Sequence, residues 1–413
     1  MNVVVCEDGK VPQLDPVTLA RPAYAITCGG YRLIDWLTAL DQPLFASVRP
    51  HLQEIQQVDY PVLPAERLAV AEETLLVNAR LVPSVETHRV LTGLIAGRQP
   101  CCVPGDGPFA AALVPGDLAL PPLPWTGERM KTVSDAVATL PAAERTLPLL
   151  EYPHDVVRYN MQTLGENLEH RLAHGDYREI RDGVFVAPGV QLGEHCVTQT
   201  RSGPIVVETA ATIGPFCYLS GPALIGRGAK LIEHAAIKDA VSVGHTTKIG
   251  GEVEASVIEP YTNKQHHGFL GHSYLGSWIN LGAGTCNSDL KNTYGRVNMD
   301  YGGERVATGM QFVGCLMGDY SKTAINTGIF TGKTVGVCSM IYGFVTANVP
   351  SFVNYARLFG QVTELPPEIM IQTQERMFRR RNVIQRPCDI QLIHDMYELT
   401  RDDRQLAGEP LAL

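Results

Sequence analysis

Residues 207–249, VETAATIGPFCYLSGPALIGRGAKLIEHAAIKDAVSVGHTTKI, decide the fold of the larger part of this chain. An aliphatic residue returns at every sixth position, in the series Val207, Ile213, Leu219, Ile225, Leu231, Ile237, Val243 and Ile249. This period fits neither an α-helix nor one alternating strand. It is typical of a parallel β-helix whose short strands point aliphatic side chains into a shared core. A β-sandwich with accidental spacing is the alternative, and eight consecutive matches argue against it.

Small residues fall four positions after several of the aliphatic ones, where each coil must bend; they include Ala211, Ala229 and Ala235. The repeat extends back through Val186 and Leu192 and returns loosely between Met317 and Ile341. We therefore expect a β-helix domain over residues 181–350.

The N-terminal part, residues 1–180, has a different pattern. Short apolar runs at residues 1–6 and 73–81 read as buried strands, and residues 31–40 and 159–174 have helical spacing. Residues 104–124 are rich in Pro and Gly and are predicted to be a connecting loop. Alternating strands and helices favour an α/β domain, with a boundary near residues 176–182. The tail, residues 351–413, contains two predicted helices at 366–381 and 389–399, placed to cap the solenoid.

Composition narrows the function classes. The 413 residues carry 34 basic and 43 acidic side chains, so the formal net charge is −9, which argues against a nucleic-acid scaffold. No stretch is apolar enough to span a bilayer, and residues 1–10 lack the pattern of a signal peptide. The ten cysteines form no Cys-x-x-Cys pair. We expect a cytoplasmic protein with reduced thiols.

Polar residues interrupt the repeat between residues 263 and 292. Three histidines, His266, His267 and His272, lie within seven residues, and Asn280-Leu-Gly-Ala-Gly-Thr285 follows. Irregular polar sequence inside a regular solenoid is a common position for a functional site. A histidine, with an ordinary pKa of about 6.5, accepts a proton near neutral pH.

The spacing His266-x₁₃-Asn280-Leu-Gly-Ala-Gly-Thr285 resembles the acetyltransferase centre of the GlmU-type bifunctional enzymes, which are UDP-N-acetylglucosamine diphosphorylases and glucosamine-1-phosphate N-acetyltransferases. A divergent bacterial branch of that family is similar over roughly residues 1–350. Motifs that carry this similarity are Thr212-Ile-Gly-Pro-Phe216, Lys248-Ile-Gly-Gly-Glu-Val253, Asn263-Lys-x-His266, Met317-Gly-Asp319 and Tyr152-Pro-His-Asp155.

The resemblance implies a nucleotidyltransferase-like α/β domain, a left-handed β-helix of hexapeptide repeats and a short helical tail. It implies transfer of an acetyl group from acetyl-CoA to the amine of a hexosamine 1-phosphate. If the first domain is active, the resemblance also implies uridylyl transfer from UTP to the sugar 1-phosphate, with Mg²⁺ as the cofactor. His266 would be the catalytic base. Substrate contacts would come from Asn280, Asn287, Lys291 and Phe269, and CoA contacts from Gly282, Ala283, Lys322 and Asn326. The family's homotrimer, which builds each site between coils of neighbouring subunits, is expected here too.

Two positions depart from the family pattern. Ser220 lies in the stretch where an arginine that holds the sugar phosphate is expected, and Phe269 replaces a tyrosine. In the first domain no Gly-rich loop with a basic residue is present, and Cys28-Gly29-Gly30-Tyr31-Arg32 is a weak substitute. The nucleotidyl-site candidates there are Arg21, Asn78 and Asp155.

Two other functions remain open. A non-catalytic protein that binds sugar nucleotides would explain the missing Gly-rich loop. A metalloenzyme of the γ-carbonic-anhydrase type would use His234, His267 and His272 as Zn²⁺ ligands.

Overall fold

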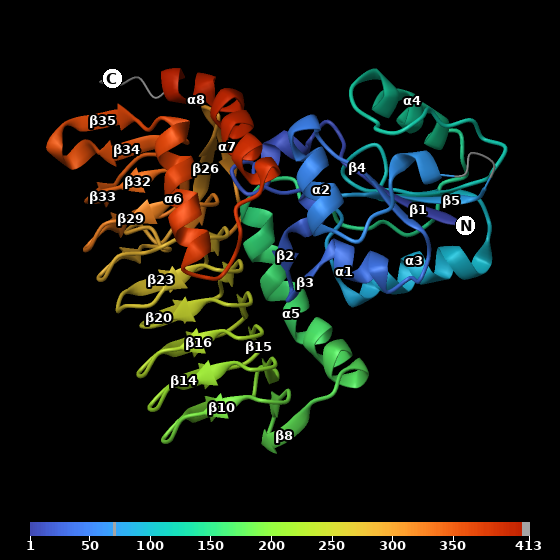
Figure 1. Cartoon of the computed structure of the whole chain (residues 1–413). Coiled ribbons are helices and arrows are strands. Elements are labelled where there is room, and N and C mark those ends of the chain that lie inside the picture. Colours follow the sequence, from blue (N-terminus) through green and yellow to red (C-terminus); the bar gives the residue numbers. More distant parts are fainter. Residues whose placement is uncertain (69–71, 407–413) are drawn as a thin grey trace. The chain divides into compact units, whose positions relative to one another are not determined.

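The computed structural model describes residues 1–68 and 72–406 of the chain (Figure 1). They form two compact units. The first consists of Met1–Thr27 and Tyr31–Tyr152, and the second of Cys28–Gly30 together with the residues from Pro153 onward. None of the described helices combines the length and apolar character that a membrane span requires.

The first unit is an α/β domain built on a mixed sheet. Among its described residues five strands pair in the order β4-β1-β5-β7-β6, with bounds Leu44–Ser47, Asn2–Cys6, Thr74–Asn78, Ala111–Val114 and Cys101–Val103. Strands β4, β1 and β5 are parallel, whereas β7 is antiparallel to both of its neighbours. The helices are α1 (Leu33–Thr38), α2 (Gln53–Asp59), α3 (Val85–Gly97) and α4 (Glu128–Val137).

The predicted strands at residues 1–6 and 73–81 are confirmed as β1 and β5, in which every residue is buried. The predicted loop at residues 104–124 is wrong in part, because it contains the buried strand β7. The four residues Ala111–Val114 are an apolar run too short to show a period, and the surrounding prolines concealed it.

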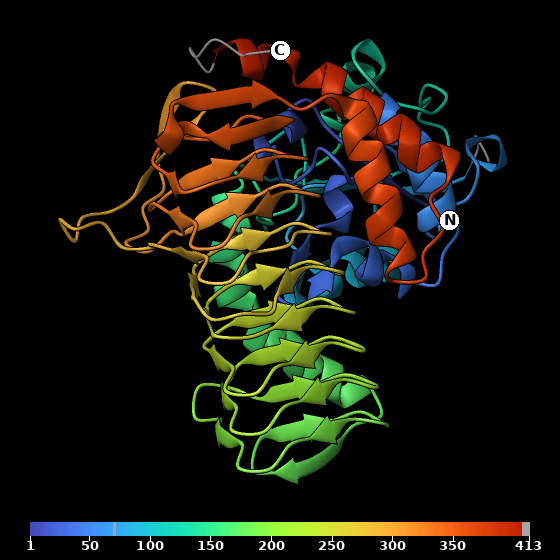
Figure 2. The same ribbon diagram turned by 60° about the vertical axis from the view of Figure 1, so that its left-hand side comes forward.

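The second unit is a parallel β-solenoid with three faces (Figure 2). Face A contains β8 (Arg178–Arg181), β9 (Val184–Val186), β12 (Ile205–Val207), β15 (Ala223–Ile225), β18 (Val241–Val243), β21 (Val257–Ile258), β24 (Tyr274–Leu275), β28 (Cys315–Met317) and β31 (Lys333–Val335). Face B contains β10 (Gln191–Leu192), β13 (Thr212–Ile213), β16 (Lys230–Leu231), β19 (Lys248–Ile249), β22 (Asn263–Lys264), β29 (Lys322–Thr323), β32 (Met340–Ile341), β34 (Val353–Ala356) and β35 (Gln361–Glu364). Face C contains β11 (Val197–Gln199), β14 (Tyr218–Ser220), β17 (Ala236–Lys238), β20 (Glu252–Glu254), β23 (Phe269–Gly271), β25 (Cys286–Asn287), β30 (Gly328–Ile329) and β33 (Phe344–Val345).

The register confirms the six-residue repeat. On face A, Ile205 pairs with Ala223 and Ala223 with Val241, so three repeats make one coil. All eight aliphatic residues of the series are at most 3% exposed and belong to one core. The corner alanines Ala211, Ala229 and Ala235 are buried as well.

One insertion leaves the stack of coils. The antiparallel hairpin of β26 (Asn298–Tyr301) and β27 (Glu304–Ala307) belongs to it. It is anchored within the second unit, because the Tyr301 hydroxyl lies 2.8 Å from Nδ1 of His154 and Asn348 donates a hydrogen bond to the carbonyl of Asp300.

The C-terminal end of the solenoid is closed by the β34–β35 hairpin and the buried ring of Phe352. Two tail helices were predicted as a cap; α6 (Pro367–Arg379) instead runs back along the coils (Figure 1). Its Phe378 ring packs 4.5 Å from Trp278, and Arg381 donates to the side-chain oxygen of Asn263. The helices α7 (Pro387–Leu399) and α8 (Arg401–Leu406) follow, and Tyr397 packs edge-on against Phe352.

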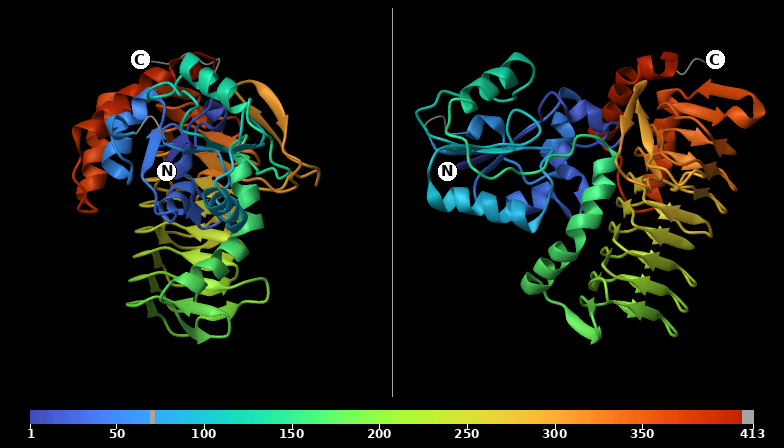
Figure 3. Two further views of the ribbon diagram at one scale, coloured as in Figure 1. Left: turned by 90° about the vertical axis from the view of Figure 1, so that its right-hand side faces the viewer. Right: turned by 180° about the vertical axis from the view of Figure 1, so that it is seen from behind.

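Helix α5 (His154–His174) lies along the solenoid (Figure 3). The sequence placed it in the first domain, but it groups with the second unit. Its docking combines apolar and polar contacts. Leu164 and Leu168 are buried in one cluster with Val206 and Leu224 of the solenoid. The side-chain oxygen of Asn160 accepts from Gly29 N and Ser242 Oγ, and its Nδ2 donates to the carbonyl of Ala240. The side chain of Asn160 is completely buried, so these bonds have no competitor from water.

We expect Asn160→Ala to lower the free energy of unfolding by about 1–3 kcal/mol, because it leaves buried donors and acceptors without their partner. The matched control is Gln162→Ala, at an exposed position of the same helix. Thermal and urea unfolding followed by circular dichroism measures both variants. Equal midpoints for the two would contradict the assigned role of Asn160.

Candidate functional sites

The first candidate site is the corner between faces B and C that carries His266. Strand β22 precedes this corner and β23 follows it. The side chain of His266 is exposed, and its backbone carbonyl accepts a hydrogen bond from Lys264 Nζ at 2.9 Å. The neighbouring His267 is exposed as well.

Asn280 lies in the adjacent coil, on face B. Its backbone bridges Asn263 on one side and Lys322 on the other, which continues the parallel ladder. Because Leu281 beside it is buried in the core, the side chain of Asn280 points outward and is exposed. The corner therefore has an accessible imidazole in one coil and an accessible amide in the next.

The predicted CoA-binding backbone is tightly packed. Gly282 N donates to both the carbonyl and the hydroxyl of Thr323, so this N–H group is already used. A Cβ on Gly282 would meet the backbone of Ala324 at 2.5 Å, which explains why glycine is needed there. The carbonyl of Ala283 accepts from Asn326 N, and the side chain of Asn326 is exposed. Among Gly282, Ala283 and Asn326, Asn326 is the residue with a polar side chain exposed to solvent.

Three other predicted residues form hydrogen bonds with the protein's own backbone. Asn287 is 6% exposed, and its amide both accepts from Gly271 N and donates to Gly271 O. Lys291 donates to the carbonyl of Arg296 in its own loop. Lys322 donates to Tyr320 O, and burial lowers the pKa of Lys322 to about 8. Their direct contact with a ligand stays a prediction that requires these groups to move.

Phe269 and Ser220 lie on face C. Phe269 is half-buried on β23, and Ser220 is buried and donates a hydrogen bond to Asp239 at 2.9 Å. The position expected to hold an arginine is thus occupied by a short, internally bonded side chain.

The histidine cluster does not assemble a metal site. His272 is buried, with Nδ1 2.9 Å from Asp289 Oδ2, and its ring stacks on Phe312. His234 stacks on Phe216. In the described part of the chain no group of three or more His, Cys, Asp or Glu side chains is arranged to hold a metal ion.

The predicted nucleotidyl-site residues are divided between the two units. Arg21 and Asn78 belong to the first unit and Asp155 to the second, where it pairs with Arg158 at 2.7 Å. The segment Cys28–Gly30, the weak candidate for a phosphate loop, also belongs to the second unit. Gly29, with a φ of 60°, docks against α5, where a Cβ would meet Thr163 at 2.2 Å. Close packing against α5 therefore explains why position 29 is a glycine, without a role in phosphate binding.

Asp8, directly after β1, is the centre of a buried network. Arg80 donates to both carboxylate oxygens of Asp8, at 2.9 and 2.7 Å, Asn78 Nδ2 donates at 2.9 Å, and Lys10 N at 3.0 Å. Burial by itself raises the pKa of Asp8, but these donors outweigh it and hold the pKa below 3.8. A Mg²⁺ ion needs oxygen atoms that are free to coordinate it. The carboxylate of Asp8 already accepts four hydrogen bonds, and the amide nitrogen of Asn78 points at it, so Asp8 and Asn78 do not fit a Mg²⁺ ion.

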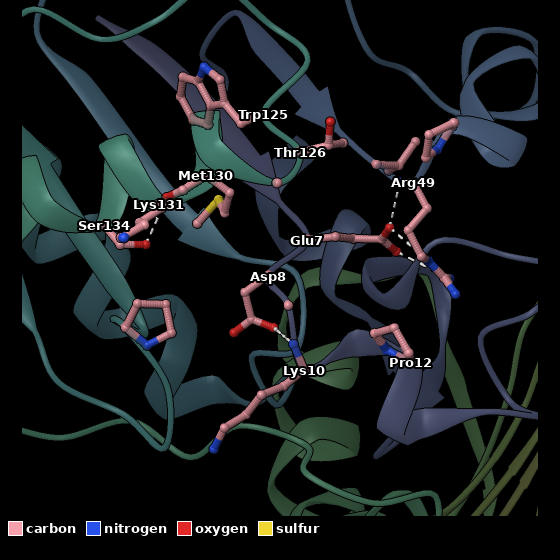
Figure 4. A pocket seen from close by; sticks show the side chains of 15 residues that line it. Glu7, Asp8, Lys10, Pro12, Arg49, Trp125, Thr126, Met130, Lys131 and Ser134 are labelled. Carbon is pink, nitrogen blue, oxygen red and sulfur yellow. Dashed lines mark hydrogen bonds and ion pairs between the residues drawn. The ribbon is translucent and has the colours of Figure 1, made fainter.

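A cavity of about 440 Å³ opens beside this network (Figure 4). Its lining comes from the segments after β1 and β4 and from α4; the polar members are Glu7, Asp8, Lys10, Arg49, Thr126, Lys131 and Ser134, with Trp125 and Met130 among the apolar ones. Glu7 is paired with Arg49 at 3.1 Å. This cavity was not predicted from the sequence. The available signal was that Glu7-Asp8 and Val48-Arg49 each follow a buried strand, because the carboxyl ends of neighbouring parallel strands meet at one edge.

We expect Arg80→Met to lower the free energy of unfolding by about 3–5 kcal/mol, because it leaves the buried carboxylate of Asp8 without its cation. Arg89→Ala removes an exposed ion pair with Glu86 and is expected to change stability by less than about 1 kcal/mol. Urea unfolding at pH 7 compares the two. A small effect of Arg80→Met would mean that water replaces its side chain.

Comparison with known proteins gives matches to parts of the chain. Residues 3–174 match the family model described as sugar nucleotidyl transferase. The bifunctional protein GlmU of Cupriavidus pinatubonensis is 30% identical over 121 residues, 28% of this chain and 26% of the relative. A bifunctional sugar-1-phosphate nucleotidylyltransferase/acetyltransferase of Sulfurisphaera tokodaii is 28% identical over 148 residues, 35% of this chain and 37% of the relative. The matched regions thus cover only 26% and 37% of these two relatives.

Solved structures give weaker likenesses. The UDP-N-acetylglucosamine acyltransferase of Francisella novicida has a TM-score of 0.35 at 16% identity, over 57% of this chain and 79% of that one. The acetyltransferase domain of PglB from Neisseria gonorrhoeae, in complex with acetyl coenzyme A, has a TM-score of 0.18 at 9% identity, over 83% and 92%. Across residues 3–174 the chain matches the sugar nucleotidyl transferase family, and over part of its length it is similar to bifunctional nucleotidyltransferase–acetyltransferases.

Proposed function

We propose that the second unit transfers an acetyl group from acetyl-CoA to the amine of a hexosamine 1-phosphate. The observation that carries the proposal is that two exposed side chains lie in adjacent coils: His266 is at a coil corner, and Asn280 is opposite Asn263, three residues before His266. The similarity to bifunctional nucleotidyltransferase–acetyltransferases supports the same class of reaction.

The proposed chemistry needs one base and one orienting group. The amine nitrogen of the sugar attacks the thioester carbon, a C–N bond forms and the C–S bond breaks. His266 takes the proton that the amine loses and returns it to the departing thiolate. Asn280 holds the amine in line for attack, because an amide oxygen accepts an N–H bond without removing the proton.

The corner is open to solvent in a single chain, and the proposed homotrimer would supply the opposite wall of the site. Recognition of the sugar phosphate is assigned to Lys291, whose ammonium is on the insertion loop and must exchange its bond to Arg296 for one to phosphate. Ser220, where an arginine was expected, offers no charge for this purpose.

The test is release of CoA thiol with glucosamine 1-phosphate and with galactosamine 1-phosphate. His266→Ala is expected to lower kcat by about 100-fold or more, as loss of a general base does. His267→Ala, at the adjacent exposed histidine, is the matched control and should retain activity. Equal activity of the two variants would exclude His266 as the base. No thiol release from wild type with any amino-sugar phosphate would refute the proposed reaction.

A second candidate function concerns the first unit: we propose that its cavity binds a nucleotide or sugar nucleotide without Mg²⁺. The cavity lies at the carboxyl ends of parallel strands, and Lys10 and Lys131 bring positive charge to a mostly apolar lining. Asp8 is occupied by Arg80, so phosphate recognition is assigned to the lysines rather than to a bound cation.

Titration of UTP and UDP-N-acetylglucosamine, each with Mg²⁺ and with EDTA, tests this binding. We expect affinity to persist in EDTA and to fall about tenfold in Lys131→Ala, which removes one charge-assisted hydrogen bond. Arg129→Ala, at an exposed neighbour on α4 outside the cavity lining, is the control. Binding that disappears in EDTA would refute the metal-free site. Release of pyrophosphate from UTP and a sugar 1-phosphate would show turnover rather than binding alone.

A further inference from the structure

A lysine occupies the interior of the solenoid where other coils have aliphatic residues. On face B the inward positions of successive coils are Leu192, Ile213, Leu231, Ile249, Lys264, Leu281, Thr323 and Ile341. Lys264 pairs directly with Ile249 and is 2% exposed. The repeat is therefore broken by a charged side chain in the coil that carries His266.

The ammonium of Lys264 has two specific acceptors. Nζ donates to the carbonyl of Gly250 at 2.8 Å and to the carbonyl of His266 at 2.9 Å. One bond reaches the preceding coil and the other reaches the corner, so Lys264 ties the backbone of His266 to the coil beneath it. Glu252 on β20 and Cys286 on β25 are the charged and titratable groups that act on it from neighbouring strands.

The corner that Lys264 holds is irregular on both sides. Lys248 and Glu252 of the preceding coil are four residues apart, whereas their partners Asn263 and Phe269 are six residues apart. Asn263 pairs with Asn280, and Gly284 N bonds to the carbonyl of His267, four residues after Asn263. In the next pair of coils Asn326 N bonds to the carbonyl of Ala283, only three residues after Asn280. Two residues of this corner therefore have no counterpart in the preceding coil, and the Nζ donor of Lys264 bonds the corner's backbone from inside the core.

This arrangement is costly for the fold. Burial lowers the pKa of Lys264 to about 8 from an ordinary value of 10.5. An apolar side chain of similar size at such a position is often neutral or stabilising relative to a buried charge. The aliphatic residues at the same position of other coils show that the solenoid itself does not need a lysine there.

We infer that Lys264 is a positioning residue that fixes the corner carrying His266. The inference rests on the proposed acetyl transfer. By holding the carbonyl of His266, Lys264 restricts where the imidazole can lie, and a base placed in advance needs no rearrangement at the moment of reaction.

The experiment compares Lys264→Met with Lys230→Met, which removes an exposed lysine from the outer surface of the same face. We expect Lys264→Met to keep or raise the midpoint of thermal unfolding at pH 7, and to lower kcat for thiol release about tenfold with KM for acetyl-CoA unchanged. Lys264→Gln retains N–H donors and should recover part of the rate. Lys230→Met should match wild type in both respects.

The stability of the variants has a defined pH dependence. The unfolded chain holds the Lys264 proton up to about pH 10.5 and the folded chain only up to about pH 8, so wild type gains stability as pH rises between these values. The stability advantage of Lys264→Met over wild type should therefore shrink from pH 7 to pH 10.

Amide hydrogen exchange of residues 265–268 gives a readout that does not depend on activity. Exchange should accelerate in Lys264→Met and not in Lys230→Met. Unchanged kcat, unchanged exchange, or a lowered unfolding midpoint in Lys264→Met would each overturn the inference. If wild type has no acetyltransferase activity, the proposed function fails, and the exchange data still decide whether Lys264 orders the corner.

Discussion

The close stacking of parallel coils is the constraint on which the second unit depends. Each strand pairs with the strand one coil away, so backbones approach to about 4.8 Å along the whole solenoid. At some corner positions this leaves no room for a side chain: a Cβ on Gly214 would lie 2.6 Å from the backbone of Glu233. Aliphatic side chains fill the interior, and any residue that departs from this pattern disturbs both its neighbours.

Departures from the repeat gather in the coils around His266. Lys264 and Thr323 replace aliphatic residues on the inward side of face B, and the hydroxyls of Thr285 and Thr323 bond to each other inside the core. The insertion that contains the β26–β27 hairpin leaves the stack shortly afterwards (Figure 2). A regular solenoid gains stability from every identical coil. Its irregular coils are therefore the ones in which another requirement has competed with packing.

The sequence predicts features that repeat over short distances, and it does not predict contacts between residues far apart in the chain. The six-residue period is readable because it repeats within a few residues, and each of its eight aliphatic positions is in the core. By contrast, Asp8 and Arg80 meet across 71 intervening residues, and no spacing rule connects them. The inward position of Lys264 has no local signal either, because nothing in the sequence distinguishes a lysine that points inward from one that points outward. The glycines of the Cys28–Gly30 segment predicted a phosphate loop, but they pack closely against α5, and the sequence does not show this contact.

The two units bury charges of opposite sign: the first buries the carboxylate of Asp8, and the second buries the ammonium of Lys264. In the first, the carboxylate after β1 is neutralised by Arg80 and saturated with donors. The cations on the cavity lining are Lys131, Lys10, which lies 3.4 Å from Glu151, and Arg49, which pairs with Glu7. In the second, the buried cation Lys264 is bonded to backbone carbonyls, and the exposed groups at the corner are the neutral side chains of Asn280 and Asn326 and the imidazole of His266. A lysine at the wall of a cavity suits the binding of a phosphate, whereas an exposed imidazole suits proton transfer from an amine. The electrostatics thus favour ligand recognition in the first unit and group transfer in the second.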